Sequence, residues 1–184
     1  MRLLQSVVLA LSIVLFLAAP GGAQQRTPTR DEVRTMLSGV EQGPSAEEWQ
    51  GLAPATLGVL VAVADDASEL PVVRLRAIGA AAYFATAEAR RFLLRTARAR
   101  AAEGLVVRAV VRALARGWGA AAVGDVAGFA AHDDVAVREA VISALASMRG
   151  DAEHGAEATR VLRARVSVER DEALAAQLRQ ALQG

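Results

Sequence analysis

A stripe of apolar residues that recurs along the chain constrains the fold more than any other feature. In residues 132–148 apolar side chains stand at positions i, i+4, i+7, i+8 and i+11, which form one face of a helix. They are Val137, Val141, Ala144, Leu145 and Met148. Asp133 and Asp134 precede the stripe, where carboxylates cap free N–H groups, and Gly150 follows it. The segment predicts an amphipathic helix.

The same outline occurs three more times, in residues 69–83, 103–115 and, more weakly, 171–182. The first three copies each carry an acid and then a Val-Arg pair, with steps of 34 and 30 residues between the arginines Arg74, Arg108 and Arg138. Ala175 replaces the arginine in the last copy. The register of the second copy is open by one residue, because aligning residues 113–115 with 144–146 fits about as well.

Each copy is preceded by a segment that is compatible with a helix, in residues 54–64, 88–98, 120–130 and 156–166. Helical stripes at such intervals, without strand alternation, are typical of solenoids in which each helix pair buries its apolar face against its neighbours. Four pairs exceed the minimum of about three needed for a continuous core. The sequence therefore predicts an all-α fold, an α-solenoid of about four stacked antiparallel helix pairs.

Residues 46–184 resemble the HEAT-repeat proteins, and among them the bacterial type called phycobilisome-lyase-like. Residues 133–145 carry the most specific part of the likeness. The resemblance implies a right-handed superhelix, usually an armadillo-like helical scaffold that binds proteins. It concerns the shape of the repeats and implies no lyase chemistry.

Residues 1–23 have the order of parts of a secretory signal peptide. Arg2 is followed by an apolar run over residues 7–19, a Pro-Gly break and Ala23. We expect cleavage after Ala23 and a periplasmic or extracellular location. The apolar run is shorter than the roughly 20 residues of a membrane span, and retention as an uncleaved anchor is the alternative. The chain has no Cys and hence no disulfides.

Residues 24–45 are interpreted as a linker that contains a short N-terminal helix. Two pairs of residues have the spacing of a capping box: Thr29 with Glu32, and Ser45 with Glu48. A terminal repeat must cover the open end of a solenoid, and we expect Trp49 and Leu52 to do so.

No HExxH sequence, glycine-rich phosphate loop or GxSxG sequence is present. We therefore expect a protein that is not an enzyme and holds no cofactor. A metal site that joins His132 and His154 to Asp133 and Asp134 is conceivable, since histidine and carboxylates bind zinc. Helix capping by the aspartates is the simpler explanation, and we predict no metal.

All 21 cationic side chains are arginines, because the chain contains no Lys. Residues 90–116 hold eight of them against one acid, Glu103. Like charges at a spacing of four residues destabilise a helix by roughly 0.2–0.5 kcal/mol per pair, so helix stability does not explain this arrangement. The candidate partner-binding residues are Arg91, Arg95, Arg98, Arg108, Arg112 and Arg116.

These arginines have a structural alternative, an ordinary solvated face whose acids come from neighbouring repeats. The repeat arginines in particular are expected to form a ladder of ion pairs along the loops. That ladder would join Arg74, Arg108 and Arg138 to Asp66, Glu103, Asp133 and Asp134.

Two functions from different classes fit the sequence. The first is an exported, non-catalytic scaffold or adaptor that binds a protein or peptide through the surface of its stacked helices. The second is an envelope-associated binder of anionic ligands, lipid head groups or acidic glycans, through an arginine-rich face. Export argues against nucleic acid, and no membrane span is expected after the signal peptide is removed.

Overall fold

The protein is all-α, as predicted, in a computed structural model that describes residues 25–39 and 43–183. Within these two stretches no strand occurs, and two short 3-10 turns accompany the α-helices. The signal peptide predicted for residues 1–23 lies outside the described residues. The helices are α1 (Arg30–Ser38), α2 (Ala46–Gln50), α3 (Thr56–Asp65), α4 (Pro71–Ala81), α5 (Ala87–Ala99), α6 (Gly104–Trp118), α7 (Val123–Ala127), α8 (Val135–Met148), α9 (Gly155–Val166) and α10 (Glu172–Gln183).

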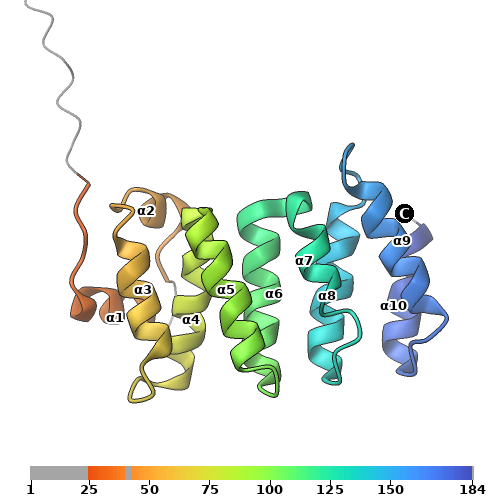
Figure 1. The fold of residues 1–184 in the computed structure, drawn as a ribbon, viewed down its shortest axis with the longest axis horizontal. Helices are drawn as coiled ribbons and strands as arrows, with labels where there is room; N and C mark the ends of the chain where they lie inside the picture. Colours follow the sequence, from red (N-terminus) through yellow and green to blue (C-terminus); the bar gives the residue numbers. More distant parts are fainter. Residues whose placement is uncertain (1–24, 40–42, 184) are drawn as a thin grey trace, which may run out of the picture.

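From α3 onward the helices pair in chain order and stand side by side in two layers (Figure 1). One layer holds α3, α5, α7 and α9, and the other holds α4, α6, α8 and α10. Short loops join the helices of each pair, which therefore run antiparallel. In the second layer α4 contacts α6, α6 contacts α8, and α8 contacts α10. Membership of the HEAT family and a right-handed twist remain predictions.

The register of the second repeat follows from burial. Val106 begins the buried stripe of α6 as Val73 begins that of α4 and Val137 that of α8, and each is at most 3% exposed. The alignment of residues 113–115 with 144–146 is therefore the correct one of the two that the sequence allowed.

This register separates Arg108 from the other repeat arginines. Arg74 and Arg138 hold the same position in α4 and α8, but the matching residue of α6 is the buried Val107. Arg108 lies one position further along, where α4 carries the half-buried Leu75. It therefore belongs to the outer surface of α6.

Small residues let the helices of the second layer approach closely. Ala77, Ala81 and Ala113 are completely buried. A Cβ atom added to Gly117 would lie 2.8 Å from the Ala82 carbonyl oxygen, closer than two such atoms can pack. The abundance of alanine and glycine thus sets the distance between neighbouring pairs.

Both predicted capping boxes are present at the N-terminal end. Thr29 accepts a hydrogen bond from the N–H of Glu32, whose carboxylate accepts one from the N–H of Thr29. Ser45 and Glu48 exchange the same pair of bonds at the start of α2. These reciprocal bonds satisfy N–H groups that a helix end leaves without partners.

The N-terminal segment closes one end of the core. Trp49 is 2% exposed, as expected of a residue that covers an open end, and Leu52 packs beside it at half burial. Helix α1 buries Val33 and Leu37 against α3 and α4. The helix that we interpreted as part of a linker is therefore packed into the same core.

The third pair departs from the pattern, because its first helix is short. The helix considered for residues 120–130 is a 3-10 turn at Gly119–Ala122 followed by the five residues of α7. Gly119 ends α6 with a φ of 52°, a conformation that glycine adopts at little cost, and Gly128 ends α7. Glycine at both ends leaves room for little more than one helical turn.

The predicted core is confirmed, since its members are at most 2% exposed and lie in one continuous cluster: Val110, Val111, Leu114, Val141 and Leu145. The cluster contains residues of every pair from α3 to α10. Each pair therefore depends on its neighbours for burial.

Truncation of a residue in this cluster tests the stacked-pair packing. We expect Leu114→Ala and Leu145→Ala each to lower the free energy of unfolding by about 2–5 kcal/mol, because both side chains are completely buried. Leu105→Ala, at a side chain that is 64% exposed, is the matched control and should change stability by less than about 0.5 kcal/mol. Chemical denaturation measures all three, and losses as small as the control's at both core positions would contradict this packing.

Candidate functional site

The six candidate arginines lie in two stripes on opposite faces of the stack. Helix α5 turns its buried side toward α6 and exposes three arginines on its other side, and α6 does the reverse. These are the α5 stripe, Arg91, Arg95 and Arg98, and the α6 stripe, Arg108, Arg112 and Arg116. The structure does not bring the two stripes together, so they form two surfaces.

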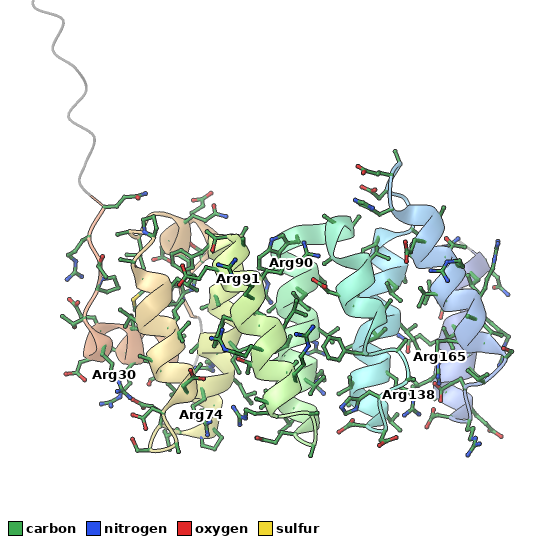
Figure 2. The ribbon with its side chains drawn as sticks, viewed as in Figure 1. Arg30, Arg74, Arg90, Arg91, Arg138 and Arg165 are labelled. Atoms are coloured by element: carbon green, nitrogen blue, oxygen red, sulfur yellow. The ribbon has the colours of Figure 1, made fainter. Side chains whose placement is uncertain are left out.

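Neither stripe forms an ion pair with any residue that the structure describes. Their neighbours in the chain differ in this respect. Arg90 donates to Asp125 at 2.6 Å and so connects α5 to α7 (Figure 2). The next residue, Arg91, forms no such pair with a described residue. Arg100 pairs with Glu103. Neighbouring repeats therefore supply no ion-pair partner to the two stripes in the described part of the chain.

A buried ion pair shows how the stack uses its other arginines. Arg138 and Arg165 lie close together near the loop end of the last two pairs (Figure 2). Arg138 donates to both carboxylate oxygens of Glu169 at 3.0 Å, and Arg165 donates to one at 2.6 Å. The side chain of Glu169 is 1% exposed. The cluster joins α8 to the loop after α9.

The charge of Glu169 is held by these bonds. Hydrogen bonds from Arg138 lower the pKa of Glu169 to about 2, against the opposing effect of burial, and Arg165 adds to the shift. The backbone N–H groups of Arg170 and Asp171 also donate to its carboxylate. Glu169 therefore stays ionised well below neutral pH.

The predicted ladder of repeat arginines is wrong in its pairings. Arg74 donates to the Ala64 carbonyl oxygen at 3.0 Å, and Arg138 pairs with Glu169, which the ladder did not include. Arg108 forms no ion pair among the described residues, because in the observed register it takes the position of Leu75, not that of Arg74 and Arg138, and lines the hollow beside α4.

The acids of the ladder also have other roles. Asp66 pairs with Arg30 of α1, and Glu103 pairs with Arg100. Asp134 caps α8 by accepting from the N–H of Ala136 at 2.8 Å. Ion pairs do connect the loop ends, but with partners that the repeat pattern does not reveal.

A hollow of about 240 Å³ lies between α4 and α6, beside the α6 stripe. Helix α4 contributes Leu75 and Gly79, and α6 contributes Leu105 and Ala109. The three arginines of the α6 stripe complete the lining. This groove between α4 and α6, the α4–α6 groove hereafter, has one cationic wall and one apolar wall.

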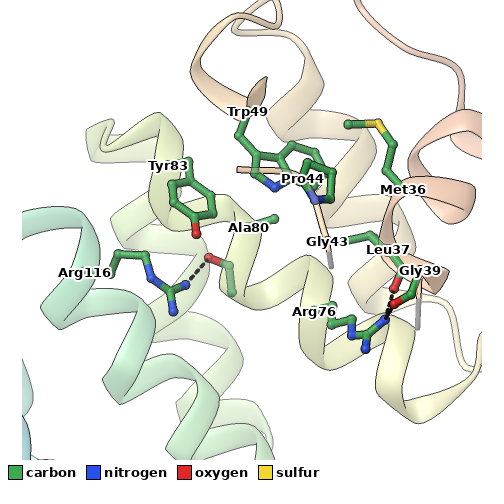
Figure 3. Close-up of a pocket in the computed structure, with 11 residues that line it drawn as sticks. Met36, Leu37, Gly39, Gly43, Pro44, Trp49, Arg76, Ala80, Tyr83 and Arg116 are labelled. Carbon is green, nitrogen blue, oxygen red and sulfur yellow. Dashed lines mark hydrogen bonds between the residues drawn. The ribbon is translucent and has the colours of Figure 1, made fainter. Parts of the chain in front are cut away.

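A second hollow, of about 310 Å³, adjoins the α4–α6 groove (Figure 3). Gly79 and Arg116 line both hollows, so the two meet there. Arg116 donates to the Gly79 carbonyl oxygen at 3.3 Å and lies over the ring of Tyr83, 5.4 Å from its centroid. These two contacts hold the guanidinium of Arg116 at the junction.

Another arginine of the second hollow serves the fold. Arg76 donates to the carbonyl oxygens of Leu37 and Gly39 at 2.6 and 2.8 Å (Figure 3). These carbonyls end α1, where a positive charge suits the negative end of the helix dipole. Arg116 is therefore the cation of this hollow that is least engaged by the fold.

The opposite side of the α6 stripe has a different charge. Glu139 of α8 lines a hollow there together with Arg112 and Arg116, although no ion pair forms. The lining of the α4–α6 groove contains no acid among the described residues. The α4–α6 groove is therefore the more favourable side for an anionic group.

The conceivable metal site is not assembled. His132 precedes α8 and His154 follows it, so the two histidines lie at opposite ends of that helix. His132 bridges neighbouring loops through the Ala101 carbonyl oxygen at 3.0 Å. In residues 25–39 and 43–183 no group of three His, Cys, Asp or Glu side chains could hold a metal ion.

Comparison with known proteins gives no relative. Neither the family models, nor the curated proteins, nor the solved structures contain a match to this chain. Among the described residues no helix is long and apolar enough to cross a membrane.

The apolar wall of the groove was not predicted from the sequence. Leu75 and Gly79 lie one turn apart on α4 and line the groove, and Tyr83, in the 3-10 turn that follows α4, lines the adjoining hollow. The three hold the positions where α6 carries Arg108, Arg112 and Arg116. The correct repeat register would have placed these residues opposite the arginines. Their role was hidden because that register was left open.

Replacement of Glu169 tests the buried ion pair. We expect Glu169→Gln to lower the free energy of unfolding by about 3–5 kcal/mol, because Arg138 and Arg165 lose the carboxylate that pairs them. The exposed pair Glu157–Arg160 is the control, and Glu157→Gln should cost at most about 1 kcal/mol.

The pH dependence gives a second check on this pair. The pKa of Glu169 is lowered on folding, so its contribution should be complete above pH 4.5 and disappear as the pH falls toward 2. The stability difference between Glu169→Gln and the unaltered protein should narrow over that interval. A difference that is small at pH 7, or constant down to pH 2, would argue against the pair's role.

Proposed function

We propose that the protein is an exported, non-catalytic scaffold or adaptor that binds a protein or peptide through the second layer of its helix pairs. The α6 stripe carries this proposal. Three arginines border an apolar hollow and have no ion-pair partner among the described residues, although arginines nearby are paired. No described carboxylate pairs with these charges where they stand, and a binding role explains their position.

The HEAT-like repeat pattern supports the same proposal. Stacked helix pairs present a long surface whose outward residues can change without loss of the core. Leu105, 64% exposed, and Val72, 49% exposed, add apolar area to the side of α4 and α6 that bears the stripe. Apolar area next to arginine is common in protein-binding surfaces.

The α5 stripe favours a second candidate function. Arg91, Arg95 and Arg98 are exposed, unpaired among the described residues and not beside any of the hollows described above. A cationic stripe without a hollow suits a flat anionic surface, such as lipid head groups or acidic glycans. The two candidate functions therefore use opposite faces: the α6 stripe would bind a protein or peptide, and the α5 stripe an anionic surface.

Removal of each stripe distinguishes the two candidates. Arg108→Gln/Arg112→Gln/Arg116→Gln should abolish capture of a protein partner from an envelope fraction, while helicity and melting temperature stay nearly unchanged. The matched control, Arg91→Gln/Arg95→Gln/Arg98→Gln, loses the same charge and should still capture it. Unaltered capture by a well-folded α6 variant would remove the binding site from this face. The anionic surface would be favoured instead if only the α5 variant lost capture and if the unaltered protein captured its partner only at low salt.

The N-terminus of the mature chain tests export. We expect mass spectrometry of the protein from its native host to find a chain that begins at Gln24 in an extracytoplasmic fraction. The signal-like order of residues 1–23 is the reason. An intact Met1 in a soluble cytoplasmic fraction would contradict the export proposal.

A further inference from the structure

We infer that the α4–α6 groove binds an extended peptide in which acidic and apolar residues alternate. The inference rests on the proposed function and specifies the chemistry of the partner. It follows from the two unlike walls of the groove and from the spacing of the side chains along them.

The walls call for two kinds of side chain. On the α6 side Arg108, Arg112 and Arg116 lack carboxylate partners among the described residues, and guanidinium groups bind carboxylates with paired hydrogen bonds. On the α4 side stand Leu75 and Gly79, which offer no charge. A ligand that lies between the walls must be acidic along one side and apolar along the other.

The spacing of the arginines matches an extended chain. Residues four apart on a helix are separated by about 6 Å along its axis. In an extended peptide, side chains two residues apart point the same way and lie about 6.6 Å apart. Acids at every second position would therefore meet the three arginines of the α6 stripe in turn, and the residues between them would face α4.

Gly79 makes room for such a chain. It stands in the apolar wall, beside the guanidinium of Arg116, and lines both hollows. A Cβ atom at this position would meet only the guanidinium of Arg116, at 3.7 Å, which is an ordinary contact. A larger side chain would project into the groove where the peptide is expected to lie.

A flat anionic surface fits the groove less well. The binding groups lie beside a hollow with an apolar wall, where a single chain can reach both walls and a sheet of head groups cannot. Tyr83 and Trp49 line the adjoining hollow, and Trp49 is almost completely buried. The peptide is therefore the occupant that uses both walls.

Titration calorimetry with defined peptides tests the inference on the full chain. The probe is a soluble peptide in which three Asp alternate with three Leu, flanked by Gly and Ser. The control peptide has the same composition with the three Asp and the three Leu in separate blocks. We expect the alternating peptide to bind at least about tenfold more tightly, because only its acids can meet all three arginines while its Leu face α4. Equal affinity for both peptides would overturn the inference.

Two matched pairs of variants locate the site. Arg112→Gln should weaken binding of the alternating peptide about tenfold, whereas Arg95→Gln on the opposite face should leave it unchanged. Gly79→Ala should bind normally and Gly79→Leu should not. Both substitutions favour the helix, so a loss in Gly79→Leu alone reports occlusion of the groove. Normal binding by Arg112→Gln and Gly79→Leu would overturn the inference.

The outcomes also separate this inference from the proposed function. A protein captured in an Arg112-dependent manner, without binding of either peptide, would overturn the alternating peptide and leave the scaffold in place. Binding to vesicles of anionic lipid that depends on Arg112, without peptide binding, would overturn both.

Discussion

Every helix pair in this chain buries its apolar face against the next pair, and the rest of the structure depends on this packing. Close approach makes it effective. Gly117 lies so near the Ala82 carbonyl that no larger residue fits, and alanines fill the planes between α4, α6 and α8. Since the stack is only two helices thick, each helix of the second layer has one side that is not covered by the first layer. The α6 stripe occupies such a side.

The arginines divide according to this geometry. Some reach carbonyl oxygens or acids of a neighbouring segment: Arg76 donates to the carbonyl oxygens that end α1, Arg149 reaches the end of α10, and Arg138 pairs with Glu169. These contacts fix one pair against the next. Others, such as Arg112, form no ion pair among the described residues. An oxygen of a neighbouring segment within reach, and not composition, separates structural from available arginines.

The periodicity of apolar residues was enough to predict the class of fold, the helix pairs and the core around Leu114 and Leu145. The need to cover the open end of the stack predicted the burial of Trp49. Periodicity could not reveal that the first helix of the third pair is only α7, because glycine conformation decides it. It also left the register of the second repeat open by one residue. The wrong one of the two registers placed Arg108 in a ladder of ion pairs. The apolar wall that faces the α6 stripe depends on contact between helices far apart in sequence, which no local pattern contains.

The central claim is that the stack engages some arginines and leaves the α6 stripe available for a partner. Mass-spectrometric mapping of arginine modification by phenylglyoxal in the native protein tests it most directly, because the reagent needs an accessible guanidinium. The account predicts fast modification of Arg112 and Arg116, and protection of Arg138 and Arg165, whose side chains are 13% and 17% exposed, until the protein unfolds. Modification of Arg138 at the same rate as Arg112 in the folded protein would contradict the division, and with it the argument for the site.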